Sequence, residues 1–223
     1  MPRVIFWDVD TQYDFMRADG RLYVPGSEEI IPTVRALTDF AHAHGITIVA
    51  SADDHVPGHR ELSDTPDWRE TFPPHCMRGT PGQQKIAETA LRDPLLIEPE
   101  PEDGAAFLAR VRAHRGHFLL HKHWFDVFTN ANVLPLLDAL APELVVLYGV
   151  ALDVCNRYAI EGLLAHRADA TLWLVTDAAR AIDADAAEGL LADWAARGVR
   201  HVTAREILEE GALAPWLGAG AAV

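Results

Sequence analysis

The amino-acid sequence predicts an α/β protein with a doubly wound, mainly parallel sheet between two layers of helices, a three-layer α/β/α architecture. Short apolar runs recur along the 223 residues, and segments with helical spacing lie between them. The chain is 49% hydrophobic and 23% charged without a low-complexity tract, a composition that can bury one continuous core. We therefore expect a single domain over residues 1–210 and a C-terminal tail over residues 211–223.

Five apolar runs have the length and composition of buried parallel strands. The clearest helical spacing lies between the first two runs, with Ser27 as the expected N-cap and Gly45 just past the helix end. A second helix is expected over residues 183–198. Alternating strands and helices imply right-handed crossovers, which place helices on both faces of the sheet. The predicted strands cover residues 4–7, 46–50, 117–120, 144–148 and 171–175.

Two segments depart from this alternation. Residues 56–83 contain many Pro, Gly, Asp and Thr residues and show no sustained period, which is typical of a long functional loop. Residues 211–223 are rich in Ala and Gly. We expect them to form a loose tail or a segment that docks on a partner, so a homo-oligomer is one assembly to consider.

The charge and the N-terminus exclude several classes of partner. A formal net charge of -14 with scattered Lys and Arg residues repels phosphate backbones and anionic lipids, so neither nucleic acid nor a membrane is an expected partner. The apolar run at residues 4–7 is too short for a signal-peptide core or a membrane span. The expected location is the cytoplasm, where Cys76 and Cys155 stay as free thiols.

Polar residues follow four of the predicted strands. Asp10 follows the first strand, Asp53 the second, Lys122 the third and Cys155 the fourth. In open α/β sheets, ligands bind beyond the carboxyl ends of the strands, so we expect these side chains to meet. A carboxylate beside a lysine and a thiol can accept the thiol proton, a task that histidine performs in many enzymes with a cysteine nucleophile.

Cys155 and Lys122 each allow a functional and a structural interpretation. Cys155 lies in a short turn before the next predicted helix, where helix-end N–H groups favour a thiolate and backbone N–H groups can stabilise an oxyanion. The alternative is a buried structural thiol. Lys122 would need a carboxylate partner if it is buried, for which Asp10 is the candidate. The alternative is a lysine that extends to solvent.

A third set of residues suggests a metal site. Asp53 and His55 lie on one side of an extended segment, and His75 lies in the long loop that follows. A carboxylate with two imidazoles suits zinc, iron or manganese and leaves positions for water or substrate. His59 could add a fourth ligand. The alternative is a hydrogen-bonded loop anchor without metal.

Four segments resemble motifs of the isochorismatase-like cysteine hydrolases, and of their nicotinamidase branch in particular. Residues 10–15 resemble the family's Asp-x-Gln-x-Asp-Phe, and residues 53–55 its metal-binding Asp-x-His. Residues 72–80 are close to the nicotinamidase Trp-Pro-x-His-Cys-x-x-Gly-Thr. Residues 149–155, paired with Lys122, resemble the Gly-x-Ala-x-x-x-Cys nucleophile turn. The resemblance extends over nearly the whole chain and implies the isochorismatase-like hydrolase fold.

The resemblance also implies roles for these residues. Cys155 is then the nucleophile, Asp10 the proton shuttle and Lys122 the residue that tunes both. A cis peptide between Val150 and Ala151 is implied, which turns the N–H groups of Ala151 and Cys155 toward an oxyanion. The implied ligands of a divalent transition metal are Asp53, His55 and His75.

Two departures from the nicotinamidase pattern concern the substrate pocket. Phe72 stands where a tryptophan usually lines that pocket, and residues 122–128 differ from the usual sequence after the lysine. Phe15, Phe72, Trp124 and Phe125 are the candidate walls for a flat substrate. The alternative is that these aromatic side chains belong to the core.

These residues and the resemblance predict an enzyme that hydrolyses a small carboxamide through a cysteine thioester. The leading substrate is nicotinamide, which would give nicotinate and ammonia. Alternatives within enzymes are an amidase for a ureido, carbamoyl or other small amide, and an isochorismatase-type vinyl-ether hydrolase. The alternative outside enzymes is a flavodoxin-like ligand-binding module, although no Gly-rich dinucleotide motif follows any strand.

Overall fold

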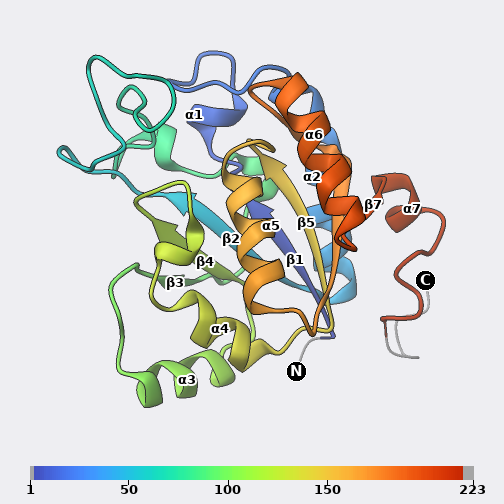
Figure 1. Cartoon of the computed structure of the whole chain (residues 1–223). Coiled ribbons are helices and arrows are strands. Elements are labelled where there is room, and N and C mark those ends of the chain that lie inside the picture. Colours follow the sequence, from blue (N-terminus) through green and yellow to red (C-terminus); the bar gives the residue numbers. More distant parts are fainter. Residues whose placement is uncertain (1–2, 218–223) are drawn as a thin grey trace.

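A seven-stranded sheet forms the centre of the molecule and carries helices on both faces (Figure 1). The computed structural model describes residues 3–217. The strand order is β3-β4-β2-β1-β5-β6-β7, and every neighbouring pair is parallel. The strands are β1 Val4–Val9, β2 Thr47–Asp53, β3 Leu95–Ile97, β4 Phe118–Lys122, β5 Leu144–Val150, β6 Thr171–Arg180 and β7 Arg200–Val202. The doubly wound fold class and its five predicted strands are confirmed.

The two strands that the sequence did not predict lie at the edges of the sheet. β3 and β7 contain three residues each, and each pairs with one neighbouring strand only. An edge strand of this length carries too few residues for a distinct apolar pattern. Its pairing depends on the strand beside it rather than on its own sequence.

Side-chain alternation along the central strand divides the core in two. Ile5, Trp7 and Val9 of β1 belong to one buried cluster, while Val4 and Phe6 belong to the other. Successive side chains of a strand point to opposite faces, so an apolar run buried on both sides is what a sheet between two helical layers requires.

The helices divide between the two faces accordingly. Buried residues of α3, α4, α5 and α6 join the first cluster, and those of α1, α2 and α7 join the second. Three short 3-10 helices, Pro81–Gln83, Ala87–Thr89 and Val127–Thr129, lie in the connections. The α-helices are α1 Tyr13–Met16, α2 Ser27–His44, α3 Gly104–Ala113, α4 Val133–Leu140, α5 Cys155–His166, α6 Ala184–Ala196 and α7 Ala204–Leu208.

The ends of the two predicted helices are correct except for one cap. Ser27 is not the N-cap of α2, because Gly26 occupies that position with φ 76° and Ser27 is the first helical residue. The Ser27 hydroxyl donates to the Phe15 carbonyl at 2.9 Å instead, which ties α2 to α1. Gly45 ends α2 in the left-handed conformation as expected, and Asp183 caps α6 by accepting from two backbone N–H groups.

The beginning of the predicted C-terminal tail packs on the second core cluster. Leu213 is buried, and the Trp216 ring lies edge-on to Trp173 at 6.5 Å between centroids. Residues 218–223 of the tail lie outside the described residues. The division into a domain and a tail stays a prediction, as does a homo-oligomer.

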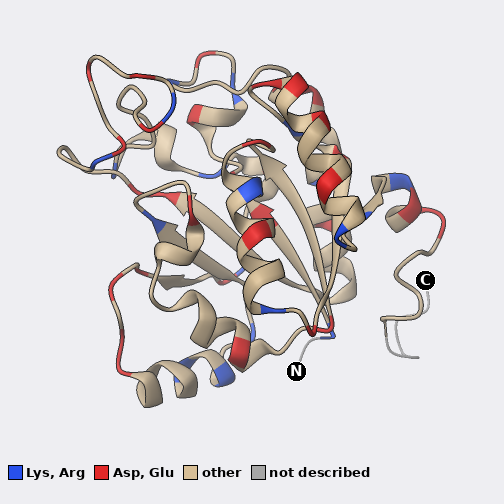
Figure 2. Ribbon diagram, in the orientation of Figure 1, with Lys and Arg blue, Asp and Glu red and all other residues tan. Residues whose placement is uncertain are grey.

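Acidic and basic residues are interspersed along the ribbon rather than gathered in separate regions (Figure 2). Among residues 3–217, no helix has both the length and the apolar character needed to cross a membrane.

A buried histidine joins β2 to β4 where the two strands begin. Nδ1 of His117 accepts a hydrogen bond from the Ile48 N–H at 2.9 Å, in place of a backbone carbonyl. Burial, together with the smaller effects of the neighbouring His42 and Arg92, lowers the pKa of His117 to about 4. The hydrogen bond needs an unprotonated Nδ1, so the folded state favours the neutral ring.

We predict that this histidine makes the fold acid-sensitive. Its pKa is lower in the folded state than the ordinary 6.5, so its stabilisation is present above pH 6.5 and is lost as the pH falls toward 4. The free energy of unfolding, measured with denaturant, should fall between pH 7 and pH 5 by about 1 to 2 kcal/mol more in the wild type than in His117→Gln. The glutamine keeps a neutral acceptor at this position. An equal loss in both proteins would contradict the assignment.

Candidate active site

The topology brings the four predicted polar strand ends to one edge of the sheet. The strand order reverses beside β1, where a doubly wound sheet opens a crevice at its carboxyl edge. Asp53 ends β2 and Lys122 ends β4, and these two residues are register partners. Asp10 follows β1, and the turn to Cys155 follows β5, the neighbour of β1 on the other side.

A buried ammonium group joins these residues. The Lys122 side chain is 1% exposed, and its Nζ lies 3.0 Å from Oδ2 of Asp10 and 3.6 Å from Sγ of Cys155. It also donates a hydrogen bond to Oδ1 of Asp53. The Asp10 partner matches the prediction, the second carboxylate was not predicted, and the solvent-directed alternative for Lys122 is wrong.

Burial and charge set the protonation preferences of this group. Burial opposes the Lys122 charge, but Asp10 and Asp53 outweigh it and raise the pKa of Lys122 well above its usual value. Burial raises the pKa of Asp10, while Lys122 and a hydrogen bond from Ser51 at 2.6 Å oppose that rise. A carboxylate with a raised pKa is a better proton acceptor for a thiol than an ordinary one.

The thiol itself retains its proton in this environment. Burial raises the pKa of Cys155 well above its usual value, and the attraction of Lys122 offsets only part of that effect. Desolvation of the buried sulfur thus opposes the stabilisation of a thiolate that the helix end would provide. The structure favours a thiol that loses its proton to a nearby base during attack.

The turn before Cys155 has the backbone that the motif implies. The peptide between Val150 and Ala151 is cis, and Cys155 is the first residue of α5. The N–H of a first helical residue has no partner within its helix, so the Cys155 N–H is free to serve an oxyanion. Gly149 has φ 122°, and a Cβ there would lie 2.0 Å from the Val9 carbonyl oxygen, so only glycine permits this approach of β5 to β1.

Next to the lysine lies a cluster of four side chains that suits a metal ion. Asp53, His55, Glu61 and His75 each offer one ligand atom, and these atoms lie within 4.8 Å of one another. Nε2 of His75 is 3.4 Å from Oε1 of Glu61 and 3.7 Å from Oδ2 of Asp53. Nε2 of His55 is 3.8 Å from Oε2 of Glu61.

The chemistry of the cluster fits a divalent cation. One atom of each residue is buried without a hydrogen-bond partner: Oδ2 of Asp53, Nε2 of His55, Oε2 of Glu61 and Nε2 of His75. Such groups are costly to bury unless something binds them. Although burial opposes a charge on His75, the two carboxylates raise the pKa of its ring to about 9, so the site attracts positive charge. Two carboxylates and two imidazoles are ligands that zinc, iron and manganese share.

Glu61, not His59, is the fourth member of this cluster. The His59 ring stands edge-on to His55, with its Nδ1 3.3 Å from the His55 Nδ1. A hydrogen bond between these nitrogens leaves Nε2 of His55 directed at the cluster, so His59 orients a ligand. Nδ1 of His75 lies 2.8 Å from the Pro73 carbonyl and is oriented in the same way. The sequence analysis missed Glu61, because a lone glutamate in a long loop carries no motif.

Two residues of the first motif hold the cluster from behind. The Gln12 side chain donates to the Asp53 carbonyl at 2.8 Å and accepts from the Asp53 N–H at 2.7 Å. Asp14 accepts from the Cys76 N–H at 2.7 Å, which fixes the residue after His75. The motif therefore places Asp10 beside Lys122 and supplies two side chains that position residues at the candidate metal cluster.

A second acidic cluster nearby lacks these features. Asp54, Glu98 and His121 also bring possible ligand atoms together. However, the Asp54 carboxylate already accepts hydrogen bonds from Arg78 and Gln83, so its charge is neutralised. Within the described residues, the cluster around Asp53 is the better metal site.

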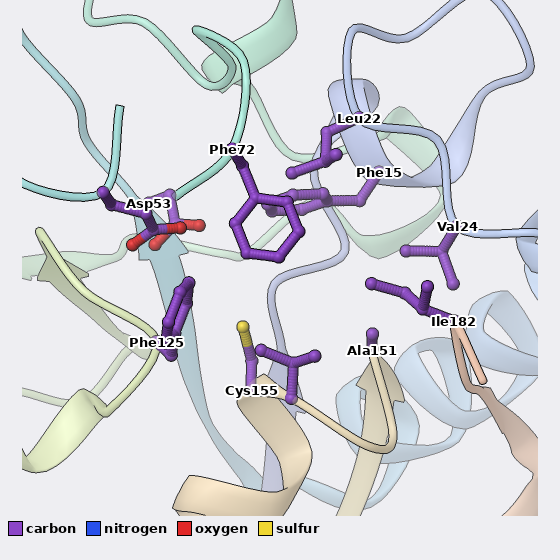
Figure 3. Close-up of a pocket in the computed structure, with 11 residues that line it drawn as sticks. Phe15, Leu22, Val24, Asp53, Phe72, Phe125, Ala151, Cys155 and Ile182 are labelled. Carbon is purple, nitrogen blue, oxygen red and sulfur yellow. The ribbon is translucent and has the colours of Figure 1, made fainter. Parts of the chain in front are cut away.

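An apolar cavity opens onto Cys155 (Figure 3). Phe15 and Phe72 line it as predicted, and Phe125 does too. Trp124 does not line it, and Arg60 lies over the Trp124 ring, with the guanidinium carbon 3.6 Å from the ring centroid. The full lining is Phe15, Leu22, Val24, Asp53, Glu61, Phe72, Phe125, Ala151, Val154, Cys155 and Ile182.

Comparison with known proteins finds relatives of this chain. A nicotinamidase/pyrazinamidase from Mycobacterium tuberculosis is 38% identical over 78 residues, which span 33% of this chain and 39% of that relative's length. A pyrazinamidase of Pyrococcus horikoshii, solved in complex with zinc, has a TM-score of 0.70 at 24% identity and covers 91% of this chain and 99% of its own.

A third similar protein is an N-carbamoylsarcosine amidase from Thermoplasma acidophilum, with a TM-score of 0.65 at 22% identity over 92% of this chain and 97% of its own. At these identities the two structural matches support the fold. The isochorismatase domain model matches residues 5–206, nearly the whole of the described chain. The chain therefore belongs to the isochorismatase family of hydrolases.

Proposed function

We propose that this protein hydrolyses a small neutral carboxamide through a thioester on Cys155, with nicotinamide as the leading substrate. One observation carries the proposal. Nζ of Lys122 lies 3.0 Å from Oδ2 of Asp10 and 3.6 Å from Sγ of Cys155, and the sulfur lines an apolar cavity. A base, a cation and a thiol at these distances constitute the apparatus for nucleophilic acyl transfer.

The residues account for each proton in such a reaction. Asp10 takes the Cys155 proton as sulfur bonds to the carbonyl carbon, and the N–H groups of Ala151 and Cys155 stabilise the oxyanion. Collapse breaks the C–N bond, and Asp10 returns the proton to the departing ammonia. Water then attacks the thioester and gives its proton to Asp10, and the acid product leaves as the proton returns to sulfur. Lys122 holds the Asp10 carboxylate in place throughout.

The cluster beside the lysine would hold a divalent transition metal. The residues that would hold it are Asp53, His55, Glu61 and His75. Such an ion supplies a Lewis acid that can bind a heteroatom of the substrate next to the thiol. Zinc is the leading candidate, since the pyrazinamidase of Pyrococcus horikoshii was solved with zinc; iron and manganese suit the same ligands.

The cavity favours a flat, uncharged amide over the alternatives. Three phenylalanines line it and its lining contains no Lys, Arg or His, which suits an aromatic ring. A ureido or carbamoyl acid, as for the N-carbamoylsarcosine amidase, would bring a carboxylate that this lining does not pair. A vinyl-ether hydrolase would leave the buried thiol without a role, and a flavodoxin-like binding module would leave the thiol, the acid and the lysine without one. We propose the cytoplasm as its location, consistent with two free cysteines.

The first prediction from the proposed function concerns the nucleophile. Cys155→Ala should abolish ammonia release from nicotinamide while the thermal unfolding temperature stays close to that of the wild type, because the change removes the covalent path and one small atom. Cys76→Ala is the matched control, since Cys76 is equally buried but does not line the cavity, and it should retain most activity. Turnover by Cys155→Ala near the wild-type rate would rule out the thioester.

The second prediction concerns the proton shuttle and its lysine. Asp10→Asn and Lys122→Met should each lower kcat by about a hundredfold or more, since a positioned acid or base alone contributes that much. The losses should not multiply in the double variant, because the two groups act as one unit. Folding of each variant is checked by circular dichroism. If the fold loss of kcat in the double variant equalled the product of the two single losses, Asp10 and Lys122 would act independently.

The third prediction concerns the metal. Elemental analysis of protein purified without chelators should find one transition-metal ion per chain, and Glu61→Gln should weaken metal affinity at least tenfold by removing a charged ligand. Glu98→Gln is the control, because it makes the same change in the neighbouring acidic cluster, and it should leave affinity unchanged. Metal loss in the Glu98 variant alone would place the ion in the other cluster.

A further inference from the structure

The cavity has two chemically different ends. Asp53 lies at one end, the metal end, where Glu61 is its neighbour in the candidate metal cluster. The aliphatic side chains of Leu22, Val24 and Ile182 lie at the opposite end, with Cys155 between the two ends (Figure 3). A substrate that offers its carbonyl to Cys155 and a heteroatom to the metal end therefore turns its remaining edge toward the aliphatic end.

Ile182 is the unusual member of that aliphatic wall. It lies between β6 and α6 and is 44% exposed, one of few large apolar side chains that the fold leaves open to solvent. Leu22 and Val24, by contrast, pack into or against the second core cluster. When a ligand covers an exposed apolar side chain that lines a cavity, binding is favoured in proportion to the apolar area that is removed from water.

The position of Ile182 is tied to the nucleophile turn. Both oxygens of the Asp153 carboxylate accept backbone hydrogen bonds, from the Ile182 N–H at 2.9 Å and from the Asp183 N–H at 2.8 Å. The Leu152 N–H also donates to the Arg180 carbonyl at 2.7 Å. Residues 152 and 153 belong to the turn that leads to Cys155, so these hydrogen bonds fix the position of Ile182 relative to the thiol.

Charge reinforces the apolar wall. The lining contains two carboxylates, Asp53 and Glu61, and no cationic side chain, while Lys122 is already engaged by two acids. A carboxylate on the outer edge of a substrate would lose its hydration here without a cation to replace it.

We infer that Ile182 selects the substrate by the edge that faces the aliphatic end of the cavity. Neutral amides with an apolar edge are accepted there, and amides that carry a carboxylate on that edge are rejected. The inference rests on the proposed function for the way in which the amide is oriented. Asp153 is then a positioning residue that holds this selecting side chain against the nucleophile turn.

The experiment measures binding, so that it does not depend on turnover. Zinc-loaded protein with Cys155→Ala is titrated calorimetrically with nicotinamide and with nicotinamide bearing a ring carboxylate at position 5 or 6. We expect nicotinamide to bind at least tenfold more tightly. Adding Ile182→Arg should reduce that preference at least tenfold for one of the two carboxylated isomers, because a guanidinium can pair the carboxylate.

The matched control is Leu96→Arg, which places the same charge at an equally exposed position, 43% exposed, outside the cavity lining. It should leave the preference unchanged. An unchanged preference in the Ile182→Arg protein, equal binding of all three amides, or binding of none would overturn the inference. Failure of the proposed function is seen separately, as a lack of ammonia release from any amide by the zinc-loaded wild type.

Discussion

The buried ammonium of Lys122 is the interaction on which the rest of the site depends. Its two carboxylate partners belong to different functions, since Asp10 faces the thiol and Asp53 faces the metal cluster. A single buried charge would be costly, and two buried carboxylates without a cation would repel each other. Together the three groups compensate one another, so Asp53 is kept ionised and Asp10 is held beside it in the same dry region.

The sheet makes this arrangement possible because its register is specific. Asp53 and Lys122 are direct partners at the ends of β2 and β4, so both side chains leave the sheet at the same height. A slip of one residue in either strand would turn its end residue to the other face of the sheet. The Gln12 side chain holds the Asp53 backbone through two hydrogen bonds, and Gly149 allows β5 to approach β1 closely. Register and close packing thus decide where the charges meet.

Polar and apolar parts of the site have separate supports. The charged residues lie at the ends of the strands, whereas the apolar cavity walls come from loops and short helices that carry Phe15, Phe72 and Ile182. Exclusion of water by these walls strengthens the interaction of Lys122 with its carboxylates and also raises the pKa of the Cys155 thiol. The same exclusion of water thus strengthens the ion pairs and favours the protonated thiol. A nearby base is therefore needed to take the thiol proton during attack.

The sequence by itself determined the fold class, the five central strands and the residues at their carboxyl ends, because burial on both faces of a sheet leaves a local pattern of apolar residues. The position of Asp10, Lys122 and Cys155 after the strands, together with the family motifs, likewise predicted that these residues meet, as they do in the structure. Only the tertiary structure decided that Glu61 rather than His59 completes the metal cluster, and that Ile182 rather than Trp124 lines the cavity. These choices depend on how loops distant in sequence fold back over the strand ends, and no local periodicity records such contacts.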